Sequence, residues 1–300
     1  MIRSMKLVFA AAVMLTGTAM LPGCNGANDN ALNQINDGPK GFMVKTLVRG
    51  DRSRKYGLFV PLTYNQNQTY PCIIFLHGVG EGGNDAKANM RVGLAPFVAL
   101  RAADFPFICI FPQSDNGQWD PDGDNATDVI AELDAVSKMY TIDPDRVSLT
   151  GLSTGGYGTW AIGGKYKERF AALVPMGSSA DPGKWAEDLA KYHMPIKSFH
   201  NSGDMFAASW NDSGMVQKVK TLGGDAEYTE YGAMGHDCWE TAYADPELFA
   251  WLQEKRRHTS HTSAPVHMTP TASAAPAGTV VPAAATPARA NVSAMVNTPY

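Results

Sequence analysis

The stretch RVSLTGLSTGGYG spans residues 146–158 and joins a β-rich run to a helix-compatible run through the pattern G-x-S-x-G. A sharp strand-to-helix turn strains the serine at its apex and needs flanking glycines, because neighbouring backbones come too close for a Cβ atom. The Ser153 hydroxyl would then project above a sheet, next to a helix N-terminus that favours developing negative charge. We predict Ser153 to be a nucleophile; the alternative is a glycine turn with an accidental serine.

Strand-like and helical runs alternate on both sides of this turn, from Gly41 to Arg257. This alternation predicts an α/β domain with a mostly parallel sheet and helices on both faces. Helices are clearest at Ala126–Tyr140, where apolar residues recur at helical spacing, and at Pro246–Lys255, where Asp245 precedes the proline as N-cap. The eight predicted strands are Met43–Val48, Tyr56–Val60, Cys72–Leu76, Phe107–Phe111, Val147–Thr150, Ala171–Met176, Ile196–His200 and Ala226–Tyr231.

A serine nucleophile needs a general base that is itself oriented by an acid. Among seven histidines, His236 fits best, because it lies in the loop between the last predicted strand and the terminal helix. His193 and His200 lie before and within a strand, where packing or surface exposure is the expected role. Three others, His258, His261 and His267, lie at the end of the domain or in the tail.

The acid should follow a strand between the serine and the histidine, and Asp204 does so. Asp181 also follows a strand, and some hydrolases place the acid one strand earlier. Asp181 and Pro182 together already explain a helix start, however, and Asp212 can likewise be explained as a helix cap. We therefore favour Asp204 as the acid and keep Asp181 as the alternative.

An oxyanion hole needs two backbone N–H groups aimed at the tetrahedral oxygen. One is expected from Thr154, the residue after the serine. The second is expected from the glycine-rich sequence HGVGEGG at residues 77–83, which follows an apolar strand. Val79 is the preferred donor and Gly78 the next choice, while His77 is expected to buttress this loop.

Composition excludes several other classes of function. Lys and Arg total 25 against 29 Asp and Glu, which gives a net charge of −4 with no basic run, so no nucleic-acid partner is expected. The four cysteines have no paired C-x-x-C spacing, and a chain of 300 residues needs no disulfide scaffold. We predict no metal site and no cofactor.

The N-terminal segment has the layout of a secretory signal, with Arg3 and Lys6 before an uncharged apolar run at Leu7–Leu21. The run ends in LPGC, which resembles the bacterial lipobox and points to lipidation of Cys24. The alternative is a plain signal peptide. We predict a signal peptide at residues 1–23, a flexible Asn/Asp/Gly-rich tether at 24–40, and an exported protein, either membrane-anchored through the lipid or secreted.

Residues 258–300 are rich in Ala, Thr and Pro and contain no Asp, Glu or Lys. They show no sustained helical or strand period, which predicts a disordered low-complexity tail. A role for the tail in adhesion or as a spacer is the alternative. The catalytic domain is therefore predicted at residues 41–257.

Taken together, these motifs resemble those of the α/β-hydrolase superfamily. They are most similar to secreted bacterial serine esterases of the predicted-peptidase, feruloyl-esterase-like and polyhydroxybutyrate-depolymerase-like types. Motifs that agree in order are the loop at 76–85, FPQ at 111–113, IDPDRV at 142–147, the turn around Ser153, and GHD at 235–237. The resemblance implies an α/β-hydrolase fold with an eight-stranded sheet, and the triad Ser153, His236 and Asp204. The sequence departs from the family at Thr154 and at Met205–Ala208.

The resemblance also implies an ester substrate, and the short segment between the sixth and seventh strands predicts that no large lid covers the site. Trp119, Tyr157 and Trp239 are candidate substrate contacts, with packing as the alternative role for each. Three further aromatic residues that could surround the mouth are Trp185, Phe206 and Trp210. Two other functions stay open, a serine peptidase of the same fold and a non-catalytic surface lipoprotein, and the oligomeric state is not predicted.

Overall fold

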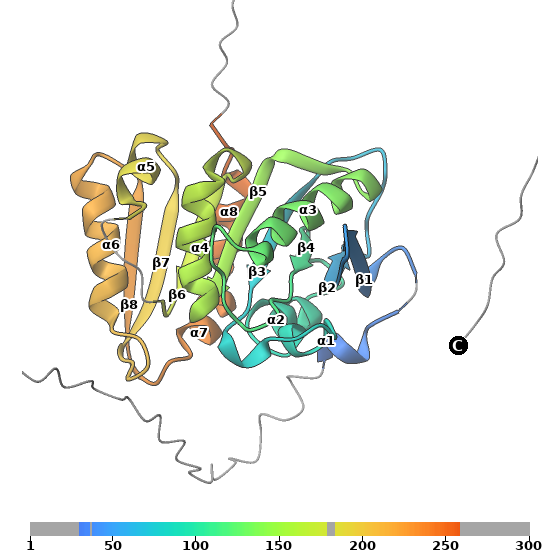
Figure 1. The fold of residues 1–300 in the computed structure, drawn as a ribbon, viewed down its shortest axis with the longest axis horizontal. Coiled ribbons are helices and arrows are strands. Elements are labelled where there is room, and N and C mark those ends of the chain that lie inside the picture. Colours follow the sequence, from blue (N-terminus) through green and yellow to red (C-terminus); the bar gives the residue numbers. More distant parts are fainter. Residues whose placement is uncertain (1–29, 37, 179–183, 259–300) are drawn as a thin grey trace, which may run out of the picture. The chain divides into compact units, whose positions relative to one another are not determined.

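The computed structural model of the protein describes residues 30–36, 38–178 and 184–258. Within them the strands form one sheet in the order β1-β2-β4-β3-β5-β6-β7-β8 (Figure 1). β1 pairs antiparallel with β2, and β2 antiparallel with β4, while the remaining neighbours are parallel. The strands are β1 (Gly41–Arg49), β2 (Arg52–Val60), β3 (Tyr70–Leu76), β4 (Ile108–Phe111), β5 (Ile142–Leu152), β6 (Ala172–Met176), β7 (Ile196–Gly203) and β8 (Ala226–Met234).

Helices cover both faces of this sheet (Figure 1). Helices α3, α4, α5 and α6 bury their apolar sides in the core of one face, and α1, α2, α7 and α8 in the core of the other. The α-helices are α1 (Asn30–Asn33), α2 (Leu94–Leu100), α3 (Asp124–Met139), α4 (Thr154–Lys165), α5 (Ala186–Lys191), α6 (Ser209–Thr221), α7 (Cys238–Ala244) and α8 (Pro246–Glu254).

The packing of helices on both faces of the sheet explains the composition of the central strands. β3, β4 and β6 are buried along their whole length, because helices lie against both of their faces, and their sequences are correspondingly apolar. Trp160 of α4 packs in one core and Phe249 of α8 in the other. Each of the eight predicted strands overlaps an observed one, which confirms the predicted mostly parallel sheet with helices on both faces.

Of the predicted helix caps, the one at Asp245 is confirmed and the one at Asp212 is wrong. Asp245 caps α8, since its side chain accepts the N–H of Glu247 at 2.9 Å. The interpretation of Asp212 as a cap is wrong: it lies inside the first turns of α6, and its side chain is fully buried. A cap serves a backbone N–H of its own helix, whereas this carboxylate is committed to groups from other elements. The predicted cap at Asp181 lies outside the described residues.

The end of the predicted tether packs on the domain. Helix α1 buries Ala31 in the core that α2 also lines, and the side-chain amide of Gln34 donates to the carbonyl of Ala99 at 3.2 Å. Apolar residues at 31, 32 and 35 supply the contact, so this part of the segment 24–40 is folded rather than a free tether. The predicted signal peptide, Cys24 and the tail from residue 259 onward lie outside the described residues.

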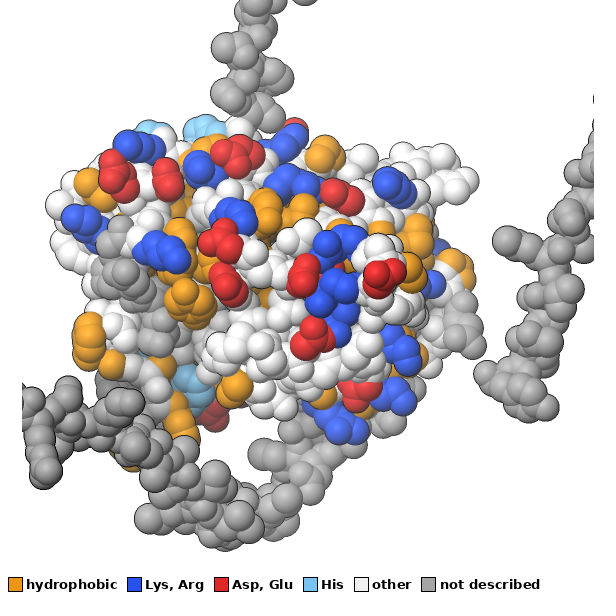
Figure 2. All heavy atoms as spheres, viewed as in Figure 1, with side chains coloured by type: hydrophobic (Ala, Val, Ile, Leu, Met, Phe, Trp, Pro, Cys, Tyr) orange, Lys and Arg blue, Asp and Glu red, His pale blue; other side chains and the backbone are white. Residues whose placement is uncertain are grey.

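On the face shown in Figure 2, basic and acidic side chains are interspersed rather than segregated. Two of the surface ion pairs join Lys165 to Asp122 and Arg49 to Asp124, each at 2.9 Å. Exposed pairs of this kind contribute little to stability. Among the described residues, no helix combines the length and the apolar character that crossing a membrane requires.

Helix α4 crosses directly over the ends of β3 and β5, and this crossing depends on Gly155. A Cβ atom added at Gly155 would overlap the carbonyl oxygen of Leu76 and would lie 2.6 Å from that of His77. Real Cβ atoms do not approach backbone oxygens so closely, so a side chain at position 155 would push the helix off the sheet.

We therefore expect Gly155→Ala to destabilise the fold by about 1–3 kcal/mol or more, because the added methyl group meets rigid backbone on two sides. The matched control is Gly232→Ala in β8, where an added Cβ meets nothing within 4 Å. Urea unfolding of both variants checks this expectation. Equal midpoints for the two alanine variants would contradict the packing argument.

Candidate active site

Ser153 occupies the junction between β5 and α4 with the backbone angles φ 56° and ψ −119°. This positive φ is rare for a residue with a side chain and marks local strain. The backbone N–H of Ser153 donates to the carbonyl of Met176 in β6 at 2.9 Å, which ties the turn to the neighbouring strand. The predicted strained serine between a strand and a helix is thus what the structure contains.

His236 lies in the short loop between β8 and α7, and its ring is partly exposed. The ring nitrogen Nδ1 lies 2.6 Å from Oδ2 of Asp204, which follows β7. Because a carboxylate only accepts, we assign the proton to Nδ1, and this leaves Nε2 as the basic nitrogen. The pair has the geometry of a general base oriented by an acid.

The side chain of Asp204 is fully buried, and every contact of its carboxylate is a donor. Oδ1 accepts the backbone N–H groups of Phe206 at 2.8 Å and Ala207 at 3.1 Å, while Oδ2 accepts His236. Burial alone would raise the pKa of Asp204, but the bonds from His236, Ala207 and Phe206 outweigh it and hold the pKa below its ordinary value. The carboxylate therefore stays ionised, as an orienting acid requires.

Ser153 and His236 both lie near Gly177, the residue after β6. A Cβ atom placed on Gly177 would lie 3.4 Å from Cε1 of His236. Gly177 and Ser153 also line one cavity of about 270 Å³. The other residues lining this cavity are Gln118, Thr154, Tyr157 and Ala207. The structure thus brings His236 and Asp204 into a hydrogen bond and relates Ser153 to them across Gly177.

The predicted oxyanion loop is held by His77, whose side chain is fully buried. The N–H of Ser114 donates to Nε2 of His77 at 3.0 Å, so the ring proton lies on Nδ1, which donates to the carbonyl of Gly78 at 2.6 Å. In a trans peptide the carbonyl of Gly78 and the N–H of Val79 point in opposite directions. His77 therefore turns the Val79 N–H away from itself.

Gly78 lies directly beside the serine. A Cβ atom on Gly78 would be 3.5 Å from Cβ of Ser153 and 3.1 Å from a carboxyl oxygen of Glu81. The N–H of Gly78 is itself bonded to the Glu81 carboxyl group, whose pKa is raised by burial against the effect of that bond. Val79 and Gly78 are the two candidates for the donor from this loop, and Val79 is thus the one whose N–H is not bonded to Glu81.

The donor from the serine turn, Thr154, begins α4, and its hydroxyl donates to the carbonyl of Gly117 at 2.7 Å.

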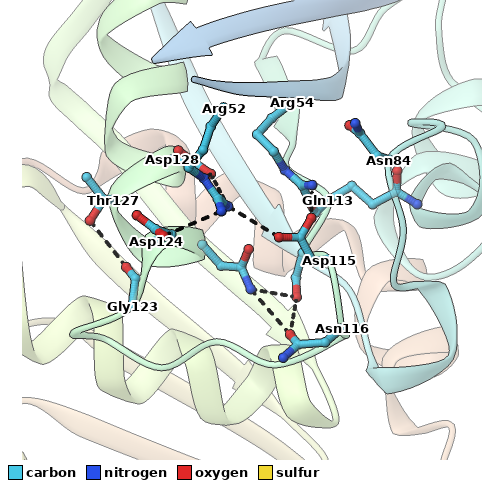
Figure 3. Close-up of polar contacts among 12 residues, drawn as sticks. Arg52, Arg54, Asn84, Gln113, Asp115, Asn116, Gly123, Asp124, Thr127 and Asp128 are labelled. Atoms are coloured by element: carbon cyan, nitrogen blue, oxygen red, sulfur yellow. Dashed lines mark hydrogen bonds and ion pairs between the residues drawn. The ribbon is translucent and has the colours of Figure 1, made fainter. Parts of the chain in front are cut away.

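Charged side chains of β2 hold the loop that carries Gly117 (Figure 3). Arg54 donates to the carbonyls of Gln113 at 2.8 Å and Gly83 at 3.1 Å, and it pairs with Asp115. Arg52 lies 2.9 Å from Asp128 of α3. These bonds connect the oxyanion side of the site to the body of the domain.

The three predicted substrate contacts have different surroundings. Trp119 is 1% exposed, and its indole N–H donates to the carbonyl of His77 at 2.9 Å, so it supports the oxyanion loop from the core instead of facing a substrate. Tyr157 lines the cavity and packs edge-on against Trp185. Trp239 lies edge-on to the His236 ring at 5.2 Å.

Sequence reasoning missed part of the site. The sequence predicts packing or surface exposure for His200 and a cap for Asp212, yet both lie in the network behind Asp204. The sequence signal for His200 was its spacing: it lies in β7, four residues before Asp204, which directly follows that strand. Cys238 is a buried thiol that donates to the carbonyl of Phe199 and packs in the core.

Together, the mostly parallel eight-stranded sheet, the strained serine after β5 and the histidine after β8 define a class, and the chain belongs to the α/β-hydrolase superfamily. Comparisons with known proteins place it in the group of esterases and peptidases. Residues 114–220 match the prolyl oligopeptidase family. The solved structure of a thermostable esterase is 29% identical with a TM-score of 0.65, over 72% of this chain and 63% of that one.

Two curated relatives are esterases. The bifunctional acetylxylan esterase/xylanase of Neocallimastix patriciarum is 26% identical over 137 residues, which are 45% of this chain and 19% of the relative. Feruloyl esterase D of Neurospora crassa is 31% identical over 125 residues, which are 39% of this chain and 42% of the relative. The chain therefore spans less than half the length of these relatives.

The charge state of His77 gives a prediction for stability. Burial lowers the pKa of His77 from 6.5 to about 4, although the bond to the Gly78 carbonyl opposes the shift. The unfolded chain thus binds a proton near pH 6.5 that the folded chain refuses until about pH 4, so this contribution to stability, about 3 kcal/mol, is present above pH 6.5 and is lost as the pH falls toward 4.

We expect His77→Asn to be less stable at pH 7 and to lose stability less steeply between pH 6.5 and 4. Free energies of unfolding from urea titrations at several pH values measure this slope. The variant His258→Asn removes an imidazole from the exposed end of the domain and is the matched control. A slope for His77→Asn as steep as that of the wild type would refute the assignment.

Proposed function

We propose that the protein is an exported serine hydrolase that cleaves carboxylic esters through an acyl-enzyme. The observation that carries this proposal is the hydrogen bond between His236 and the buried carboxylate of Asp204, at the sheet edge where Ser153 holds its strained conformation. A general base, its orienting acid and a nucleophile are the three groups that acyl transfer needs.

In this mechanism Oγ of Ser153 attacks the ester carbonyl carbon while Nε2 of His236 accepts the hydroxyl proton. The N–H groups of Thr154 and Val79 stabilise the oxyanion of the tetrahedral intermediate. Nε2 then returns the proton to the leaving alcohol, and the acyl group stays on Ser153. A water molecule, deprotonated by His236, repeats the sequence in reverse and releases the acid.

A bulky or polymer-linked ester is the proposed substrate. Phe206 is 86% exposed, and its ring centre lies 5.6 Å from that of His236, which gives the mouth an apolar wall. Tyr157 adds an aromatic side chain to the cavity beside Ser153. The feruloyl and acetylxylan esterases among the relatives support an acyl group linked to a polysaccharide.

The second candidate function is peptide hydrolysis by the same residues. The match of residues 114–220 to the prolyl oligopeptidase family favours it, because that match covers Ser153 and Asp204. A non-catalytic surface protein is the candidate of another class, and the intact pairing of His236 with Asp204 argues against it. Export and anchoring through a lipid on Cys24 remain part of the proposal.

Ser153→Ala is expected to lower kcat on a chromogenic ester by a factor on the order of 10⁶, because no other hydroxyl replaces the nucleophile. Labelling with a fluorophosphonate, followed by mass spectrometry, should place the adduct on the peptide that contains Ser153. Ser53→Ala, on an exposed serine of β2, is the control. Wild-type turnover by Ser153→Ala, or no adduct on the wild-type protein, would remove the proposed function.

Matched substrates distinguish the two hydrolytic candidates. We expect a larger kcat/KM on a feruloyl or acetyl aryl ester than on the anilide with the same acyl group, since the proposal assigns an alcohol as the leaving group. Steady-state kinetics on both series provide the measurement. A preference for anilides, or for peptides, would support the peptidase instead.

A further inference from the structure

A buried histidine, His200, touches the carboxylate that orients His236. His200 of β7 lies between Asp212 of α6 and Asp204, and all three side chains are fully buried. Its Nδ1 lies 2.8 Å from Oδ2 of Asp212. Its Nε2 lies 3.0 Å from the carbonyl oxygen of Ala207 and 3.2 Å from Oδ2 of Asp204. Both nitrogens therefore face oxygen atoms.

Counting protons fixes the charge of His200. A carbonyl oxygen only accepts, so Nε2 carries a proton. Asp212 already accepts three other donors: the indole N–H of Trp160 at 2.9 Å, the backbone N–H of Ser178 at 2.9 Å and the hydroxyl of Ser178. Donors of this kind favour the ionised carboxylate, so the proton shared with Asp212 lies on Nδ1. His200 is then an imidazolium between two carboxylates.

Other titratable groups nearby do not alter this balance. Tyr228 of β8 donates its hydroxyl to Glu230, and burial, together with that carboxylate, raises its pKa. Burial likewise raises the pKa of Cys238 in α7. Both groups stay protonated at neutral pH. The charges around His200 are therefore those of Asp204 and Asp212, with His236 beyond.

We propose that His200 is a positioning residue of the hydrolytic site: a buried imidazolium, held by Asp212, that binds the same Oδ2 atom of Asp204 that receives His236. The inference rests on the proposed function. A cation on this oxygen holds the carboxylate in place and takes up part of its negative charge. Asp204 then stabilises a protonated His236 less strongly, so that His236 is available as a base at lower pH.

The pKa of His200 agrees with this assignment. Burial alone would lower it, but the bond to Asp212, the charges of Asp212 and Asp204, and the Ala207 carbonyl together raise it above the ordinary value for histidine. Asp212 is therefore the group whose removal should discharge His200, and Asp212→Asn preserves the size of the side chain.

Asp212→Asn tests the positioning role. We expect the acidic limb of the kcat/KM profile for an aryl ester to move to higher pH by roughly one unit, because Asp204 loses its counter-cation. The matched control is Asp134→Asn, which alters a surface carboxylate of α3 that pairs with Arg169 and should leave the limb in place. An unmoved acidic limb in a folded Asp212→Asn protein would overturn the proposal.

A second measurement uses the unaltered protein and does not depend on hydrolysis. In long-range proton–nitrogen spectra of the ¹⁵N-labelled chain, His200 should give two protonated ring nitrogens at pH 7, assigned by their loss in His200→Gln. A single-tautomer neutral ring at pH 7 would overturn the proposal even if Asp212→Asn fails to fold. The absence of a Ser153 adduct and of turnover would show that the proposed function fails, whatever the charge of His200. If His200 were cationic in such an inactive protein, there would be no hydrolytic site for it to position, and the positioning role would fall together with the activity.

Discussion

The site is organised around one buried charge, the carboxylate of Asp204. An ionised carboxylate taken out of water costs several kcal/mol unless its oxygens are bonded. Here they receive the N–H groups of Phe206 and Ala207, the ring of His236 and the ring of His200. Satisfying this one group therefore fixes the loop after β7 and orients the loop after β8. The two strands pair as far as Gly203 and Met234, with a register shift just before that point, which brings both loops to the same level.

The remaining components follow from the order of the parallel strands. β3, β5, β6, β7 and β8 are consecutive neighbours in the sheet, and each is followed at its carboxyl end by one part of the site. In that order the parts are the loop at His77–Val79, Ser153, Gly177, Asp204 and His236. Groups separated by up to 159 residues of sequence thus become neighbours at one edge of the sheet. The cavity forms where the serine, the glycine and the helix start at Thr154 meet.

The parts of the fold and of the site that the sequence predicts are those that depend on residues close together in the chain. Strand runs, the glycines around Ser153 and the cap at Asp245 are decided within a few residues, and the structure contains them. Asp212 was misjudged because its partners, Trp160 and Ser178, lie 52 and 34 residues away and are hidden from any local pattern. Trp119 was expected at the mouth for a related reason: its loop position suggested exposure, while its bond to the carbonyl of His77 is visible only in three dimensions.

The two buried histidines on either side of Ser153 show how partners, rather than burial, decide charge. His77 and His200 are both fully buried, and burial disfavours the imidazolium in each. His77 meets one donor, the N–H of Ser114, and one acceptor, the carbonyl of Gly78, so a neutral ring satisfies both contacts. His200 meets acceptors at both nitrogens, two of them carboxylates, and only the protonated ring satisfies them. A neutral histidine therefore fixes a peptide on the oxyanion side, where one donor and one acceptor already satisfy its ring. A charged histidine belongs on the acid side, where it balances Asp204.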